Sequence, residues 1–294
     1  MSEPSFQRIL VPTDLSDFAV PALRWAAMLE RRLGASLTVL FANQPYVPFD
    51  VMEGPAAYAL QNTPDFRDRM ARDLRDYVAT HLPGIAPRVE TRVVDDAPAR
   101  AILDAAKDID AGLIVMATHG RSGWQRVLLG SVTERVVHLA DRPVLCIPPD
   151  TGHRDKTAIG RILCPVNFTG IARTALETAA GMAEAFDAEL LVAHIAETGD
   201  DADLSHDFEA WIEPHVRSRC RYSRLVASGD AAEETLRLAD DAAADLIVVG
   251  AQHRRFKDLT ILGTTTQRVV RFARRPVLTV TAPGAVSAKR LAVA

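Results

Sequence analysis

The chain contains an internal repeat, and this repeat limits its fold more than any other feature of the sequence. Residues 8–42 align without a gap with residues 161–195, at an offset of 153 positions (161 − 8). Residues 102–147 align without a gap with residues 235–280, at an offset of 133 positions (235 − 102). The second copy is therefore 20 residues shorter (153 − 133), and the difference falls between its second and third predicted strands. This pattern predicts two similar domains in tandem.

Each copy is predicted to contain five strands that alternate with helices. In the first copy the strands are short and rich in Val, Ile and Leu: residues 9–12, 36–42, 89–94, 113–118 and 144–148. The segment between the second and third strands carries an apolar stripe at helical spacing: Phe66, Met70, Leu74, Tyr77 and Val78. Such strands are typical of a parallel sheet with helices on both faces. We therefore predict two doubly wound α/β domains, each with a five-stranded parallel sheet.

The composition bounds the class of protein. We expect domains at 1–149 and 158–283, joined by a polar linker that contains Pro and Gly. The net charge of −4 gives no reason to expect a nucleic-acid partner, and neither a secretory signal nor an apolar run of membrane-spanning length is found. Cys146 and Cys164 lie in apolar runs, which favours buried, reduced thiols. We expect a cytoplasmic protein with no membrane partner.

A glycine-containing segment follows the fourth strand of the first copy. Gly120 and Gly123 come soon after the strand, and Gly130 and Ser131 open the next predicted helix. A helix start can bind an anion through its free amides. Residues 131–134 also have the S-x-x-E form of a capping box. Two interpretations stay open: the segment holds a di- or triphosphate, or it is a strand-to-helix connection whose Gly and Ser residues serve only turns and capping.

Asp14 follows the first strand and is expected at the same edge of the sheet. Its carboxylate could accept hydrogen bonds from an adenine or a ribose. The alternative is local, because Asp14, Ser16 or Asp17 could cap the helix that follows. Two other phosphate-binding loops are excluded: the sequence has no G-x-x-x-x-G-K-[ST], and the first strand is followed by no G-x-G-x-x-G.

These residues resemble those of the universal stress protein family in its tandem form. The family's nucleotide-binding motif, G-2x-G-9x-G-[ST], corresponds to Ala117, Gly120, Gly130 and Ser131, so that alanine replaces the first glycine. The resemblance implies two pseudo-twofold-related, Rossmann-like domains and ATP bound in the first, with Mg²⁺ left open. It places twelve residues around the nucleotide. They are Pro12, Thr13, Asp14 and Leu40 on the adenine side, and Ala117, His119, Gly120, Arg121, Gly130, Ser131, Val132 and Thr133 around the ribose and phosphates.

The second copy departs further from the motif. Asn167 replaces the aspartate, His253 replaces the second glycine and Phe256 replaces Gly123. Gly250, Gly263 and Thr264 remain, and residues 264–267 keep the capping-box form. We expect a degenerate site with a structural or regulatory role.

Two smaller features lead to weaker expectations. The first copy's insertion, residues 43–65, contains Tyr46, Phe49 and Tyr58, and could be a lid over the nucleotide or an ordered surface segment. His206 and His215 near three aspartates fit no standard metal-ligand spacing, so we expect no metal site.

Three functions follow from these observations. The first is a stress-response protein that binds ATP in its first domain. The second is a nucleotide-free interaction scaffold, and the third is a weak ATP hydrolase. No nucleophile with a fixed base is found, so dedicated catalysis is not expected. By resemblance, RPVLCI and RPVLTV could pair the two halves as an intramolecular pseudo-dimer, and further homodimerisation is left open.

Overall fold

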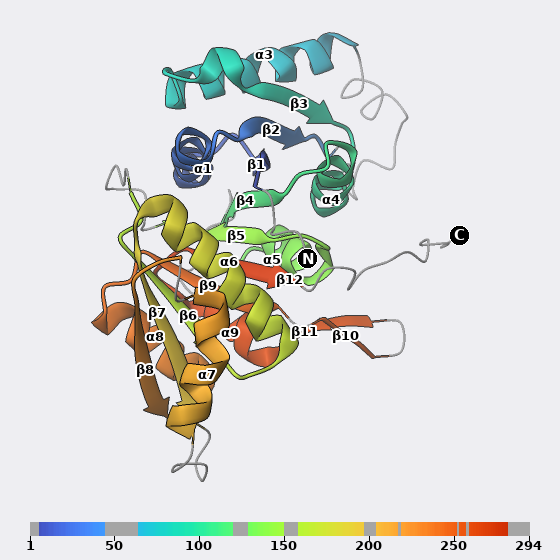
Figure 1. Cartoon of the computed structure of the whole chain (residues 1–294). Coiled ribbons are helices and arrows are strands. Elements are labelled where there is room, and N and C mark those ends of the chain that lie inside the picture. Colours follow the sequence, from blue (N-terminus) through green and yellow to red (C-terminus); the bar gives the residue numbers. More distant parts are fainter. Residues whose placement is uncertain are drawn as a thin grey trace. The chain divides into compact units, whose positions relative to one another are not determined.

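The computed structural model describes residues 6–44, 64–119, 129–149, 158–196, 204–216, 219–251, 253–256 and 259–281 (Figure 1). The contacts within the chain divide it into two compact units. One unit comprises Ser2–Val136 and Leu145–Ala158, and the other comprises Val137–Val144 and Ile159–Ala294. The domain limits at 149 and 158 stay a prediction.

The first unit contains the predicted parallel sheet. Its strands are β1 (Arg8–Thr13), β2 (Ser36–Ala42), β3 (Glu90–Val94), β4 (Leu113–Ala117) and β5 (Val144–Ile147). They lie in the order β3-β2-β1-β4-β5, and β1 pairs in parallel with both β2 and β4. The direction of winding therefore reverses between β1 and β4, which is where open α/β sheets bind ligands.

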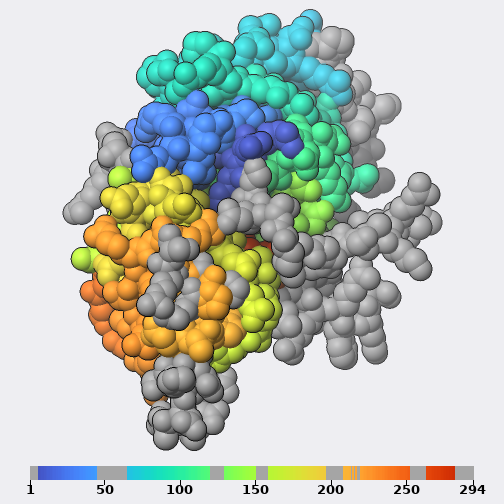
Figure 2. Space-filling model, viewed as in Figure 1, coloured from blue at the N-terminus to red at the C-terminus, as the bar shows by residue number. Residues whose placement is uncertain are grey.

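Helices connect these strands as the sequence predicts. They are η1 (Asp17–Ala19), α1 (Val20–Leu33), α3 (Pro64–His81), η2 (Ala86–Arg88), α4 (Pro98–Asp108) and α5 (Ser131–Leu139). Figure 1 shows α1 and α4 on opposite faces of the first sheet. The apolar stripe of α3 is confirmed, because Leu74 and Val78 are buried. The charged side of α3 is exposed and forms part of the surface seen in Figure 2.

The second unit repeats this arrangement. Its sheet has the order β12-β9-β6-β7-β8, formed by β6 (Arg161–Val166), β7 (Glu189–Ala196), β8 (Tyr222–Ser228), β9 (Leu246–Ala251) and β12 (Val277–Thr281). Its helices are α6 (Gly170–Phe186), α7 (Leu204–Val216), α8 (Ala231–Asp241) and α9 (Thr264–Phe272). Even the register is shared: Arg8 pairs with Ser36 in the first copy, and Arg161 pairs with Glu189 in the second.

One element was not predicted. Between β9 and α9 the second unit has an antiparallel hairpin of β10 (His253–Phe256) and β11 (Leu259–Leu262). The sequence predicted five strands in each copy, so the prediction is wrong in leaving out these two.

Burial confirms the parallel-sheet interpretation. Ile9, Leu10 and Val11 in β1 have no exposed surface, and neither do Ile162 and Leu163 in β6. The buried, unpaired thiols of Cys146 and Cys164 are confirmed as well. Burial raises the pKa of the Cys146 thiol to about 12 and also raises that of Cys164, so both are protonated at neutral pH. No helix in the described part of the chain is both long and apolar enough to cross a bilayer.

Candidate functional site

The chain turns sharply where β1 ends. The amide of Leu15 donates to the Thr13 hydroxyl at 3.0 Å. The Asp14 carboxylate accepts from the amide of Ser16 at 3.0 Å and from its hydroxyl at 2.6 Å. These are side-chain-to-backbone turns of the kind that Asp and Ser favour. Asp14 therefore makes local contacts within this loop, and its half-buried side chain lies at the carboxyl edge of β1.

The second copy makes the same turn without a carboxylate. The Asn167 side-chain oxygen accepts from the Thr169 hydroxyl at 2.7 Å, and Thr169 caps α6. The residues in the middle of the two turns, Leu15 and Phe168, have φ of 62° and 56°. This left-handed conformation is strained for bulky residues, and such strain concentrates at functional sites. Because the turn forms with either Asp14 or Asn167, it does not need a negative charge. The carboxylate of Asp14 is therefore a difference in charge between the two copies.

Tyr77 of α3 contacts the turn that follows β1. Its hydroxyl donates to the carbonyl oxygen of Ser16 at 2.7 Å. Burial raises its pKa to about 12, with further increases from Asp14 and Asp17 and an opposing hydrogen bond from Thr13. The sequence pattern placed Tyr77 only in the apolar stripe. Its hydroxyl could have indicated this contact, because a buried tyrosine hydroxyl needs a hydrogen-bond partner.

Replacing Tyr77 with phenylalanine is expected to lower the free energy of unfolding by about 1 kcal/mol, because the Ser16 carbonyl loses its donor. The pKa of Tyr77 is raised from 10.0 when folded, so the unfolded state loses the proton first as the pH rises. The stabilisation is complete below pH 10 and is lost as the pH rises toward 12. Urea unfolding of both proteins between pH 7 and 11 tests this. A difference that does not shrink above pH 10 would contradict it.

A second polar group joins the ends of β2 and β3. The backbone amide of Asn43 donates to the Val94 carbonyl at 2.7 Å, and its side-chain amide donates to the Asp95 carboxylate at 2.8 Å. Arg67 of α3 forms an ion pair with the same aspartate. Asp95 therefore connects the chain on both sides of the insertion. Tyr46, Phe49 and Tyr58 lie outside the described residues.

The residues that the resemblance places on the adenine side lie on two neighbouring strands. Pro12 and Thr13 end β1, and Pro12 pairs with Leu40 of β2. The Leu40 side chain has no exposed surface, so only its backbone is suited to face a ligand.

Two hydrogen bonds join the start of α5 to the end of β4. The amide of Gly130 donates to the Thr118 carbonyl at 2.8 Å, and the Thr133 hydroxyl donates to the Ala117 carbonyl at 2.9 Å. A Cβ at Gly130 would lie 3.1 Å from the Thr118 oxygen, so the close approach favours glycine. Next to it, the Thr118 hydroxyl and His119 Nδ1 are 2.9 Å apart.

The residues expected around the phosphates fall into two groups, those that hydrogen-bond within the protein and those that are exposed. Gly130 and Thr133 have structural bonds, whereas Ser131 is exposed and Val132 is partly exposed. The amides of Ser131, Val132 and Thr133 have no acceptor within the helix, because they belong to its first turn. Gly120 and Arg121, and also Gly123, lie outside the described residues.

The helices begin where the sequence predicts, but not through the predicted caps. The Gly130 carbonyl accepts the first helical bond from Glu134 at 2.9 Å, so Ser131 is the first residue of α5 rather than its cap. In α9 the cap is Gly263, and no side chain caps it. The capping-box prediction is therefore wrong for both helices, because the glycine before the serine or threonine takes the cap position.

Close packing explains why position 250 of the second copy is a glycine. A Cβ there would lie 3.0 Å from the Ile171 Cγ1 and 3.1 Å from its carbonyl oxygen, so the start of α6 approaches too closely for a side chain. The first copy has the short 3₁₀ helix η1 at the equivalent place and carries Ala117. The motif's first glycine therefore has a reason in the second copy that involves no ligand.

In the second copy, aromatic rings surround the turn that follows β6. Phe168 lies 4.7 Å from His194 and 5.5 Å from Trp211, centroid to centroid, and 5.8 Å from Phe208. His194 and Phe208 are buried. His253 lies in β10 and pairs with Leu262. That the second copy holds a degenerate site stays a prediction.

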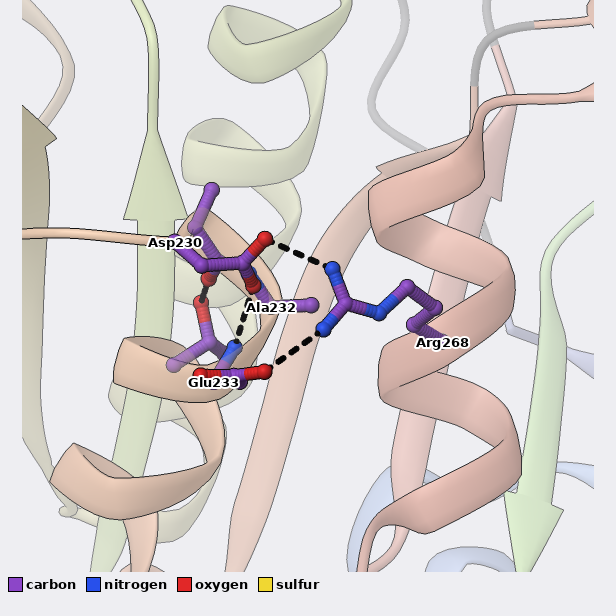
Figure 3. Close-up of polar contacts among 6 residues, drawn as sticks. Asp230, Ala232, Glu233 and Arg268 are labelled. Carbon is purple, nitrogen blue, oxygen red and sulfur yellow. Dashed lines mark hydrogen bonds and ion pairs between the residues drawn. The ribbon is translucent and has the colours of Figure 1, made fainter. Parts of the chain in front are cut away.

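A charged clasp lies at the start of α8 (Figure 3). Asp230 accepts from the amides of Ala232 and Glu233 at 3.0 and 2.9 Å, and so caps the helix. Arg268 of α9 donates to Asp230 at 2.6 Å and to Glu233 at 3.1 Å. The backbone bond from Glu233 and the bond from Arg268 lower the pKa of Asp230.

The described residues contain no group of three or more His, Cys, Asp or Glu that could hold a metal ion. The side chains of His206 and His215 lie outside the described residues, so the sequence-based expectation for them stays a prediction.

Comparison with known proteins identifies the family. The model of the universal stress protein family matches residues 5–148 and again residues 158–281. A universal stress protein of Mycolicibacterium smegmatis is 25% identical over 292 residues, which cover 92% of this chain and 96% of the relative. One from Thermus aquaticus is 34% identical over 142 residues, which cover 48% of this chain and 98% of the relative.

A solved structure agrees with these sequence matches. The crystal structure of a universal stress protein from Archaeoglobus fulgidus covers 95% of this chain and 99% of its own, with a TM-score of 0.74 and 23% identity. The repeated sheet, the shared register and the double family match lead to one conclusion: the chain belongs to the universal stress protein family, in its tandem two-domain form.

Proposed function

We propose that the first domain binds ATP at the carboxyl edge of its sheet and that the protein acts in the cytoplasm as a stress-response factor. The observation that carries the proposal is the position of Asp14 and Ser131 at the switch point. Ile9 pairs with Leu113, and this register brings the end of β1 level with the end of β4. The Asp14 turn and the start of α5 therefore leave neighbouring strands at the same edge, where such sheets take nucleotides.

The two sides of this edge suit different parts of ATP. Asp14 offers a carboxylate that can accept from a ribose hydroxyl or an adenine amino group, and Leu40 offers backbone groups. Ser131 and the first-turn amides of α5 suit phosphate oxygens. A Mg²⁺ ion bound with the nucleotide would be held by phosphate oxygens together with water, as is usual at such sites.

The second domain is proposed to bind no nucleotide and to act as a structural partner. Its adenine side holds aromatic rings, and its hairpin carries His253 in place of a glycine. Pairing of the two halves through β5 and β12, and assembly of two chains, stay predictions from the sequence.

The rival function is a nucleotide-free scaffold. One observation favours it: Thr133 and Thr266 make the same 2.9 Å bond to the strand end, so this threonine has a structural role in both copies. Weak ATP hydrolysis is the third function, and no described constellation of residues supports dedicated catalysis.

Titration calorimetry of nucleotide-stripped protein with ATP separates the first two functions. We expect saturable heat with one site per chain. The absence of heat at millimolar ATP would contradict the binding proposal and favour the scaffold. Two sites per chain would contradict the assignment of the second domain as degenerate.

A further inference from the structure

Arg135 and Arg268 occupy equivalent places in the two copies. They are related by the same 133-residue offset as the rest of this segment. The helices that carry them are anchored alike, since Thr133 bonds to the Ala117 carbonyl and Thr266 bonds to the Gly250 carbonyl, both at 2.9 Å. Each arginine follows its anchoring threonine by two positions, so the two side chains start from the same place relative to their sheets.

The surroundings of these two arginines differ in charge. Arg268 binds two carboxylates, those of Asp230 and Glu233 (Figure 3). The first-copy counterparts of these acids are Ala97 and Arg100. Ala97 offers no side-chain cap to α4, and Arg100 is itself a cation.

The two arginines of the first copy differ in their partners. Arg100 faces Asp96 and Asp104 at 3.4 and 3.6 Å. Arg135 is exposed and makes no hydrogen bond or ion pair with any residue that the structure describes. The second copy thus places two carboxylates on Arg268, whereas Arg135 in the first copy has no such partner among the described residues.

We infer that Arg135 binds the phosphate groups of the nucleotide, and that the Asp230–Arg268–Glu233 clasp is the second domain's internal substitute for that anion. This inference rests on the proposed function. Arg135 follows Ser131 by four residues, so both exposed side chains lie on the same side of α5. A guanidinium binds phosphate oxygens through paired N–H groups, as it binds carboxylates. Arg135 therefore selects ligands by their phosphate charge rather than by their base.

Replacing Arg135 with glutamine tests this selection when ATP and adenosine are titrated by calorimetry. We expect ATP affinity to fall about 3- to 30-fold, since the arginine is exposed, while adenosine affinity stays unchanged. ATP binding should also depend less on salt in the variant. Unchanged ATP affinity would overturn the inference but leave the proposed function intact. An equal loss for adenosine would overturn it too, since the effect would then be structural. Failure of the unmodified protein to bind ATP would contradict the proposed function itself.

The second copy provides the matched control. Arg268→Gln removes the equivalent guanidinium, and we expect ATP affinity to stay unchanged while the melting temperature of the second domain falls. The reverse experiment introduces the clasp into the first domain as Ala97→Asp with Arg100→Glu. This double variant should lower ATP affinity at least as much as Arg135→Gln, with the fold checked by its melting temperature. An unchanged affinity in a folded double variant would overturn the inference.

Discussion

Replacing Asp14 with alanine is expected to weaken ATP binding by about 10- to 100-fold, or about 1.4 to 2.8 kcal/mol, because a charged acceptor is lost. Asp14→Asn separates charge from geometry. Asn167 shows that an amide supports the same turn through its own oxygen, so this variant should keep the loop and lose only the carboxylate. We expect the asparagine variant to bind ATP less well than the unmodified protein and better than the alanine variant.

Calorimetry with ATP, combined with thermal unfolding, gives the readout for both variants. Asn167→Ala is the control from the second copy, and it should leave ATP affinity unchanged. If both Asp14 variants bind ATP as the unmodified protein does, Asp14 is only a turn residue and the adenine side has been assigned to the wrong loop.

Replacing Gly250 with alanine is expected to destabilise the second domain by about 1 to 3 kcal/mol, the usual cost of overpacking. The new methyl group would meet a backbone carbonyl at 3.1 Å, which cannot move unless the start of α6 moves with it. Differential scanning calorimetry should show a melting transition lower by about 3 to 9 °C. ATP affinity should not change.

Ala117→Gly is the matched control, because it makes the opposite change at the equivalent position of the first copy. We expect an effect below about 1 kcal/mol, since the residue is at the end of a strand. A Gly250→Ala protein that melts like the unmodified one would show that α6 can shift without cost.

The strands were predictable because the repeat samples the same fold twice. Apolar runs predicted the strands, whereas the alignment of the two copies implies only that they share a register, as the pairing of Arg8 with Ser36 and of Arg161 with Glu189 shows. Buried parallel strands give strong signals, since both of their faces must be apolar.

The places of the candidate site residues in the fold were predictable, whereas the contacts of each residue were less so. Asp14 and Ser131 lie at the expected edge, but the bond from Thr133 to Ala117 joins residues whose contact no local pattern reveals. The hairpin of β10 and β11 was missed because its strands are only four residues long and one carries two arginines, as a solvated loop would. Close approaches such as that of Gly250 to Ile171 depend on how a helix packs, which spacing does not encode.

The bonds of Asp95 have a consequence for the length of the first copy. Asn43 is the first residue of the insertion and Arg67 follows its last residue by two positions, and both bind this one carboxylate. The two ends of the segment are thus fastened to the domain independently of what lies between them. Loop-closure free energy rises by only about 0.6 kcal/mol for each doubling of loop length, so we expect variants with a shorter or different stretch between Asn43 and Arg67 to keep the fold of the first domain. The two contacts of Asp95 would then serve as fixed points for grafting a new segment onto this edge of the sheet, next to the ATP site that we propose.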